Sequence, residues 1–342
     1  MVIESLLLLL SLGFAAVLGF AAHRASICTV KAVEEVLTTR RAFMLLSFAK
    51  TVLWVMAVTA LLVWALPESR AKLTGWQVSL GGLAGGLVFG MGAVLNKGCA
   101  FSTLTRLGGG QLSMLVSLAG FALGVLALGL LEPPAPASTA LTSDALRVES
   151  GLGARVVVAA LGLWGLWETW RLWRSRPAGE SFRALALAER YRLSTAALLL
   201  GLSNGLLYAL HGTWAYTSTL TRGVQQATGD GTGPAPIAWL LFVFLVVGVV
   251  ASAWQRQSFR LRWRPRPGWL SYLAGGALMG FGAALVPGGN DVLILHAIPT
   301  LSPHALPAYL AMLLGIFVSL VVMRRMGASL ETIDCSGDIC RA

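Results

Sequence analysis

Long apolar runs alternate with short polar segments along the whole chain. A helix of about 20 residues spans the hydrocarbon core of a bilayer, which is about 30 Å thick. Runs of this length lie at residues 5–22, 42–66, 77–96, 111–131, 154–173, 193–210, 235–254, 268–287 and 305–323. The pattern predicts an all-α, polytopic membrane protein with about nine transmembrane helices.

Four segments that follow these runs are too short or too polar to cross a membrane. They are residues 26–36, 98–107, 213–224 and 288–298, and they are rich in Gly, Ser, Thr, Asn and Asp. Irregular backbone at membrane depth is tolerated only where it lines a cavity or packs on protein. We therefore expect four short re-entrant or half helices that converge in the interior.

The two halves of the chain resemble each other. GGLVFGMGAVLNKGCAFSTL from Gly85 matches GGALMGFGAALVPGGNDVLI from Gly275, and a weaker match at nearly the same offset places His23 on His211. Since one span, 154–173, joins two sets of four spans, the second set enters the membrane upside down, as in many transporters. The expected divisions are a first membrane repeat (1–132), a linker with a connecting helix (133–192), an inverted repeat (193–325) and a tail (326–342).

Composition and charge fit this interpretation. Hydrophobic residues make up 56% of the 342 residues and charged residues 12%, about half the share typical of a soluble domain. The net charge of +11 is spread between the apolar runs instead of forming one patch, which argues against nucleic-acid binding. Arginines concentrate in 171–192 and 256–266, on one side of the membrane, whereas 132–153 on the other side is acidic or neutral. The positive-inside rule predicts an inner-membrane protein with its N-terminus outside and its C-terminus in the cytoplasm.

Cys28 and Cys99 are the leading functional candidates, because each lies in a short segment just beyond a glycine-rich span. Nearby basic residues, among them Arg24 and Lys97, would attract an anion or favour a thiolate. Short helices that begin there would direct backbone N–H groups toward the pore, which also favours an anion. A lone buried cysteine is more often an apolar filler, so packing is the alternative for each thiol.

The other candidate pore residues offer hydroxyl, amide, backbone or carboxylate groups in the same segments: Ser26, Ser102, Thr103, Gly289, Asn290 and Asp291. The thiols are not duplicated in the second half, where Tyr216 aligns with Cys28 and Gly289 with Cys99. Asp291 would repel an anion unless it is paired, caps a helix or titrates with a carried proton. Capping of its own short helix is the expected role.

The tail, ETIDCSGDICRA from Glu331, carries Cys335 and Cys340. We expect it to be disordered, with thiols that a reducing cytoplasm keeps free to accept or pass on sulfur, or to meet a partner. No cysteine pair has CxxC spacing, so no metal is expected, and no cofactor motif is present. Direct use of ATP is not supported, because the sequence has no GxxxxGK[ST] loop.

Three motifs carry a resemblance to a known family: HRASICTV from His23, NKGCAFSTLTRLGGG from Asn96 and PGGNDVLIL from Pro287. With them the chain resembles the YeeE/YedE-type membrane proteins with sulfur transport domains. The resemblance implies an hourglass-like inverted-repeat fold and thiosulfate uptake past pore cysteines, here Cys28 and Cys99, through S–H to sulfur hydrogen bonds. It also implies a TusA-like sulfur carrier as the cytoplasmic partner. The family relay uses a further cysteine in the second half, where this chain has Gly289 or Tyr216.

Two functions follow from these observations. The first is a transporter or channel for thiosulfate or a related small sulfur-containing anion, without enzymatic activity. The alternative is a membrane thiol enzyme or sulfur relay, which forms a persulfide on a cysteine and hands the sulfur to the tail or to a carrier. A scaffold for a sulfur-carrier complex is a third possibility, and it would show no flux.

Overall fold

The fold is known from a computed structural model of the chain. It describes residues 2–65, 74–131, 138–140, 151–175, 184, 187–229, 233–262, 268–330, 333–336 and 338–341. Most of the acidic loop 132–153, and Arg176, Arg183, Arg264 and Arg266 of the basic loops, lie outside the described residues.

Each predicted apolar run corresponds to a long helix. They are α1 (Val2–Ala25), α3 (Phe43–Ala65), α4 (Leu80–Leu95), α6 (Met114–Gly129), α7 (Leu152–Arg174), α9 (Leu193–His211), α11 (Pro236–Gln255), α12 (Trp269–Leu285) and α14 (Ala305–Arg325). Among the described residues, six helical segments are long and apolar enough to cross a membrane, or seven when α12 and the bent helix after it form one span. The prediction of an all-α, multi-pass membrane protein is confirmed, with fewer qualifying spans than the nine expected.

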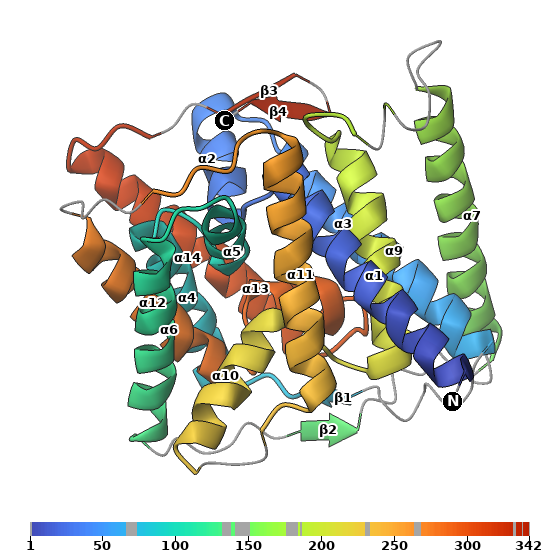
Figure 1. Cartoon of the computed structure of the whole chain (residues 1–342), viewed down its shortest axis with the longest axis horizontal. Helices are drawn as coiled ribbons and strands as arrows, with labels where there is room; N and C mark the ends of the chain where they lie inside the picture. Colours follow the sequence, from blue (N-terminus) through green and yellow to red (C-terminus); the bar gives the residue numbers. More distant parts are fainter. Residues whose placement is uncertain are drawn as a thin grey trace.

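Short helices occupy all four of the polar segments. They are α2 (Thr29–Thr39), α5 (Ala100–Gly108), α10 (Tyr216–Ala227), and α13 (Asn290–Val292), which continues as the π-helix η4 (Leu293–Ala297). Each follows a break marked by left-handed backbone, at Ser26 (φ 51°), Lys97 (φ 56°), Gly212 (φ 75°) and Gly288 (φ 138°). In Figure 1, α13 lies at the middle of the molecule, with α2 and α5 toward one end and α10 toward the other.

Glycines bring α4 and α12 into backbone contact. A Cβ built on Gly85 would lie 3.0 Å from the carbonyl oxygen of Gly282, and one built on Gly92 would lie 2.7 Å from that of Gly275. Side chains at these places would force the two helices apart, so small residues define their crossing. The contacts follow the sequence match between the halves, in which Gly275 aligns with Gly85 and Gly282 with Gly92.

Aligned glycines of the two halves also make equivalent contacts where α4 and α12 pack against their outer neighbours. Gly86 of α4 packs against the backbone of Ala308 in α14, and Gly276 of α12 packs against the backbone of Ser117 in α6. Gly276 is the residue that aligns with Gly86. On the other flank, α1 packs along α11 while α9 packs along α3, and α1 and α9 also contact each other.

Two small two-stranded sheets lie at opposite ends of the helices in Figure 1. Strand β1 (Thr74–Trp76) pairs antiparallel with β2 (Ser138–Ala140), and β3 (Asp334–Ser336) pairs with β4 (Ile339–Arg341). The chain termini also lie at opposite ends, the C-terminus beside β3 and β4.

The described part of the tail is ordered, so the expectation of a disordered tail with free thiols is wrong. Cys335 and Cys340 form a disulfide between β3 and β4. Ile333 and Cys335 are buried against Ala32 of α2 and Met44 of α3. This apolar contact offsets the entropy of ordering the tail, and the tail's own composition does not reveal it.

The glycine contacts lead to a stability prediction. Gly92→Ala places a methyl group against the α12 backbone, and overpacking of this kind costs about 1–3 kcal/mol. We expect a lower midpoint of thermal unfolding in detergent, followed by tryptophan fluorescence. Gly162→Ala on α7 is the matched control, because nothing lies within 4 Å of its added Cβ. Equal midpoints for the two variants would contradict the close α4–α12 contact.

Candidate functional site

The structure brings Cys28 and Cys99 together. Cys28 is the N-cap of α2 and Cys99 is the N-cap of α5. The backbone N–H of Cys99 donates to Sγ of Cys28 over 3.5 Å, so the two cysteines are in direct contact. Both residues are buried, with exposed fractions of 2% and 1%. The starts of two broken helices therefore meet at a pair of thiols.

A parallel arrangement of hydroxyl and carboxylate groups lies in the second half. Gly289 is the N-cap of α13, and its N–H donates to Oγ1 of Thr217 over 3.2 Å. The carboxylate of Asp291 accepts from the backbone N–H of Thr217 over 3.1 Å and from the Thr217 hydroxyl. Asp291 was expected to cap its own short helix, but these bonds cap α10 instead.

Contacts between the two halves of the chain join the Cys28–Cys99 pair to the cluster of Thr217, Gly289 and Asp291. The Asn290 amide donates to Oγ1 of Thr29, the first residue of α2, over 3.4 Å. The ring of Tyr216, at the start of α10, packs against the ring of Phe101 on α5 with their centroids 5.7 Å apart. Asn290, Thr29 and Tyr216 are all at most 3% exposed, so this contact is a closed part of the interior.

A cavity of about 30 Å³ lies at this junction. Its lining is largely apolar with three polar exceptions, and it comprises Ile27, Phe48, Thr51, Cys99, Phe101, Leu200, Asn290, Asp291, Ile294 and Leu295. That volume holds about one water, so the cavity is too small for a sulfur oxyanion in this conformation. We call it the waist.

A larger cavity, of about 280 Å³, opens on the α10 side of the waist. Its lining includes Ser218, Thr221 and Arg222 of α10, together with His296 and His304. Burial lowers the pKa of His304, which precedes α14, so its ring is neutral at pH 7. Arg222 is exposed and supplies a cation that the sequence analysis did not single out.

Of the ten predicted pore residues, Cys99, Asn290 and Asp291 line the waist and the other seven do not. Arg24 is buried, and its guanidinium donates to Ser252 over 3.1 Å, to Gln255 over 2.6 Å and to two backbone carbonyls. These bonds tie α1 to α11, which is a packing role. Ser26 and Lys97 are exposed and form the left-handed turns at which the helices break.

Ser102 and Thr103 stabilise the first turn of α5. Both hydroxyls donate to the carbonyl of Cys99 over 3.1 Å, and Thr103 accepts from the Asn96 amide over 2.6 Å. These two residues therefore position the cysteine segment.

Sequence reasoning missed Thr29, Thr217 and Phe101, and it noted Tyr216 only as the residue aligned with Cys28. One signal pointed to Thr217, because it directly follows Tyr216 and so lies next to the repeat position of Cys28. No group of three or more metal-ligating side chains lies together in the described part of the chain.

Apolar helices that cross the molecule, with breaks whose polar starts meet in the interior, define a multi-pass membrane protein of the transport class. The chain belongs to the sulphur transport family, the YeeE/YedE type, which it matches over residues 24–318. The match includes both cysteine segments and the Asn290–Asp291 segment, and it identifies a membrane protein of sulfur transport. A search among curated proteins found no match.

The bonds of Thr217 lead to a second prediction. Thr217→Val keeps the shape of the side chain but leaves the Gly289 N–H and one Asp291 oxygen without their partner, at a cost of about 1–3 kcal/mol. We expect a lower unfolding midpoint in detergent. Thr217→Ser retains the hydroxyl and serves as the control, which should stay close to wild type. If both variants unfold alike, the hydroxyl does not hold the junction.

Proposed function

We propose that the chain conducts a small sulfur-containing anion, with thiosulfate as the first candidate, across the inner membrane. The anion passes the waist, which Cys99, Asn290 and Asp291 line; Cys28 is bonded to Cys99 and Thr217 to Asp291. One observation carries the proposal: two buried cysteines are in contact where the broken helices α2 and α5 begin.

The chemistry of these helix starts suits an anion that contains sulfur. Their backbone N–H groups and the positive ends of their dipoles offset part of the cost of dehydrating an anion. A thiol is a weak, polarisable donor, and it suits the soft outer sulfur of thiosulfate better than a strongly hydrated oxygen. Cys28 and Cys99 thus favour thiosulfate over sulfate of the same charge.

We further propose that residues 1–132 and 193–325 form two inverted membrane repeats joined by the linker 133–192. The α4–α12 contacts support this, because Gly85 meets Gly282 while Gly92 meets Gly275, as a twofold relation requires. The bond of the Cys99 N–H to Cys28 also resembles that of the Gly289 N–H to Thr217. An inverted repeat places a substrate site near the midplane, where the waist lies between its halves.

The proposed orientation has the N-terminus outside and the C-terminus in the cytoplasm. Arg190, Arg192 and Arg324 belong to the arginine-rich end of the molecule, the one that would face the cytoplasm. A TusA-like carrier would then meet the protein near β3 and β4. Pull-down of such a carrier by the full chain in membranes would test this partner.

The role of the thiols leads to a third prediction. Cys99→Ala removes a donor at the waist, and we expect uptake of radiolabelled thiosulfate to fall at least about tenfold, since a charge-assisted hydrogen bond is worth about 1.5–3 kcal/mol. Uptake would be measured in proteoliposomes that contain equal amounts of folded protein. Thr105→Ala is the control, because its hydroxyl bonds within α5 and does not line the waist.

Two results would overturn the assignment. Growth of an import-deficient strain on sulfate or cystine but never on thiosulfate would exclude this substrate. A stoichiometric persulfide on Cys28 or Cys99, found by mass spectrometry with no flux into liposomes, would favour the thiol enzyme. Flux past unmodified thiols supports transport.

A further inference from the structure

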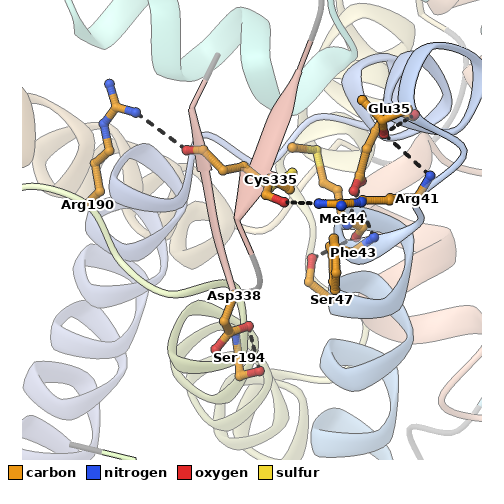
Figure 2. The surroundings of a disulfide bond; sticks show 11 residues. Glu35, Arg41, Phe43, Met44, Ser47, Arg190, Ser194, Cys335 and Asp338 are labelled. Atoms are coloured by element: carbon orange, nitrogen blue, oxygen red, sulfur yellow. Dashed lines mark hydrogen bonds between the residues drawn. A yellow bond between two sulfur atoms is a disulfide. The ribbon is translucent and has the colours of Figure 1, made fainter. Parts of the chain in front are cut away.

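The C-terminal hairpin, β3 and β4 with their disulfide, is fastened to the helices by polar contacts on several sides (Figure 2). Arg41 donates to the carbonyl of Cys335 over 3.2 Å, and Arg190 donates to that of Cys340 over 3.5 Å. The buried side chain of Cys335 packs near Met44. The hairpin is therefore docked on the membrane helices at this end of the molecule.

Asp338, in the turn of this hairpin, caps α9. Its backbone carbonyl accepts from the N–H of Leu193 over 2.7 Å, and its carboxylate accepts from the N–H and hydroxyl of Ser194 over 3.0 and 2.9 Å. The N-cap residue of α9 itself, Arg192, gives no side-chain cap. The start of this helix thus depends on a carboxylate from the tail.

The same carboxylate lines a polar cavity of about 300 Å³. Lys50, Arg171 and Ser194 line it as well. The ammonium of Lys50 lies 3.0 Å and the guanidinium of Arg171 lies 2.6 Å from the carboxylate of Glu168, and both cations also donate to the Ser194 hydroxyl, over 2.7 and 3.1 Å. With Asp338 in place the two cations face two carboxylates. Without it the cavity has one excess positive charge and two free helix-start N–H groups, which is a site for an anion.

Helices α3 and α9 contribute residues to both this cavity and the waist. Lys50 of α3 is adjacent to Thr51, which lines the waist, and Ser194 of α9 precedes Leu200, which also lines it. Six residues of helix rise by about 9 Å, so an anion at Ser194 would lie roughly that far from the waist along α9.

We propose that the hairpin is an autoinhibitory latch: Asp338 occupies an anion site formed by Lys50, Arg171 and the start of α9, and the Cys335–Cys340 disulfide keeps it there. That the anion is the transported one rests on the proposed function. Reduction of the disulfide releases Asp338 and opens the site.

The release is an ordinary thiol–disulfide exchange with a dithiol reductant. A thiolate of the reductant attacks the sulfur of Cys340, which is the less buried cysteine of the pair. The Cys335–Cys340 bond breaks as a mixed disulfide forms between Cys340 and the reductant. The second thiol of the reductant then displaces Cys340. Two electrons and two protons pass to the two cysteines, and the reductant leaves as its own disulfide. The two strands, of three residues each, form too small a hairpin to be stable without the cross-link.

The latch is tested in proteoliposomes that contain the full chain with the hairpin side accessible. Adding dithiothreitol to the wild type should raise thiosulfate flux at least about threefold. The double variant Cys335→Ser, Cys340→Ser should show the raised flux with and without reductant, which also controls for effects on the pore thiols. Asp338→Asn keeps an acceptor for Ser194 but removes the charge, and it should raise flux in the oxidised protein.

Hydrogen exchange gives a readout that does not depend on flux. The N–H groups of Leu193 and Ser194 should exchange at least about tenfold faster after reduction, because their acceptors belong to Asp338. If these groups stay protected and flux stays unchanged in the reduced protein, the latch is refuted while transport stands. If the folded wild type and both variants carry no thiosulfate, the proposed function fails, and the exchange rates still decide whether the hairpin is released.

Discussion

Helix starts that lie inside the protein need acceptors for their backbone N–H groups, and this requirement organises the structure. In each case a residue far away in the sequence or on another helix supplies one. Cys28 serves α5, Asp291 serves α10, Glu35 serves α3 and Asp338 serves α9. Because an unsatisfied buried group costs about 1–3 kcal/mol, these pairings fix which segments meet at each break. The breaks themselves place polar groups at membrane depth, where an anion can use them.

Close helix contacts make those pairings possible. The glycines of α4 and α12 let the two backbones touch, and this holds the ends of both helices near the middle of the molecule. Cys99 follows the end of α4 by four residues (99 − 95), and Gly289 follows the end of α12 by four as well (289 − 285). Packing therefore decides where the starts of α5 and α13 lie, and hydrogen bonding decides what they contact.

Much of the fold could be predicted from local pattern, since the length of an apolar run and the polarity of the next segment depend on neighbouring residues alone. The long helices and the four short ones were predicted in this way. The roles of Thr217 and Asp338 could not be predicted from local pattern, because they depend on partners 74 and 144 residues away in the sequence. The tail shows the limit most clearly: its composition is typical of disorder, and its order depends on the Cys335–Cys340 disulfide and on the surface formed by Ala32 and Met44.

The two halves of the waist differ in chemistry, and this bears on how it could open. The first half contributes two thiols, one of which already accepts the N–H of Cys99, whereas the second contributes the hydroxyl of Thr217 and the carboxylate of Asp291. In the proposed transport, an anion that passes Cys28 displaces that N–H contact, and the starts of α2 and α5 would separate. The C-terminal hairpin packs on Ala32 in α2 itself. A docked hairpin would oppose movement of α2, so the proposed latch and the proposed passage would both depend on the position of this helix.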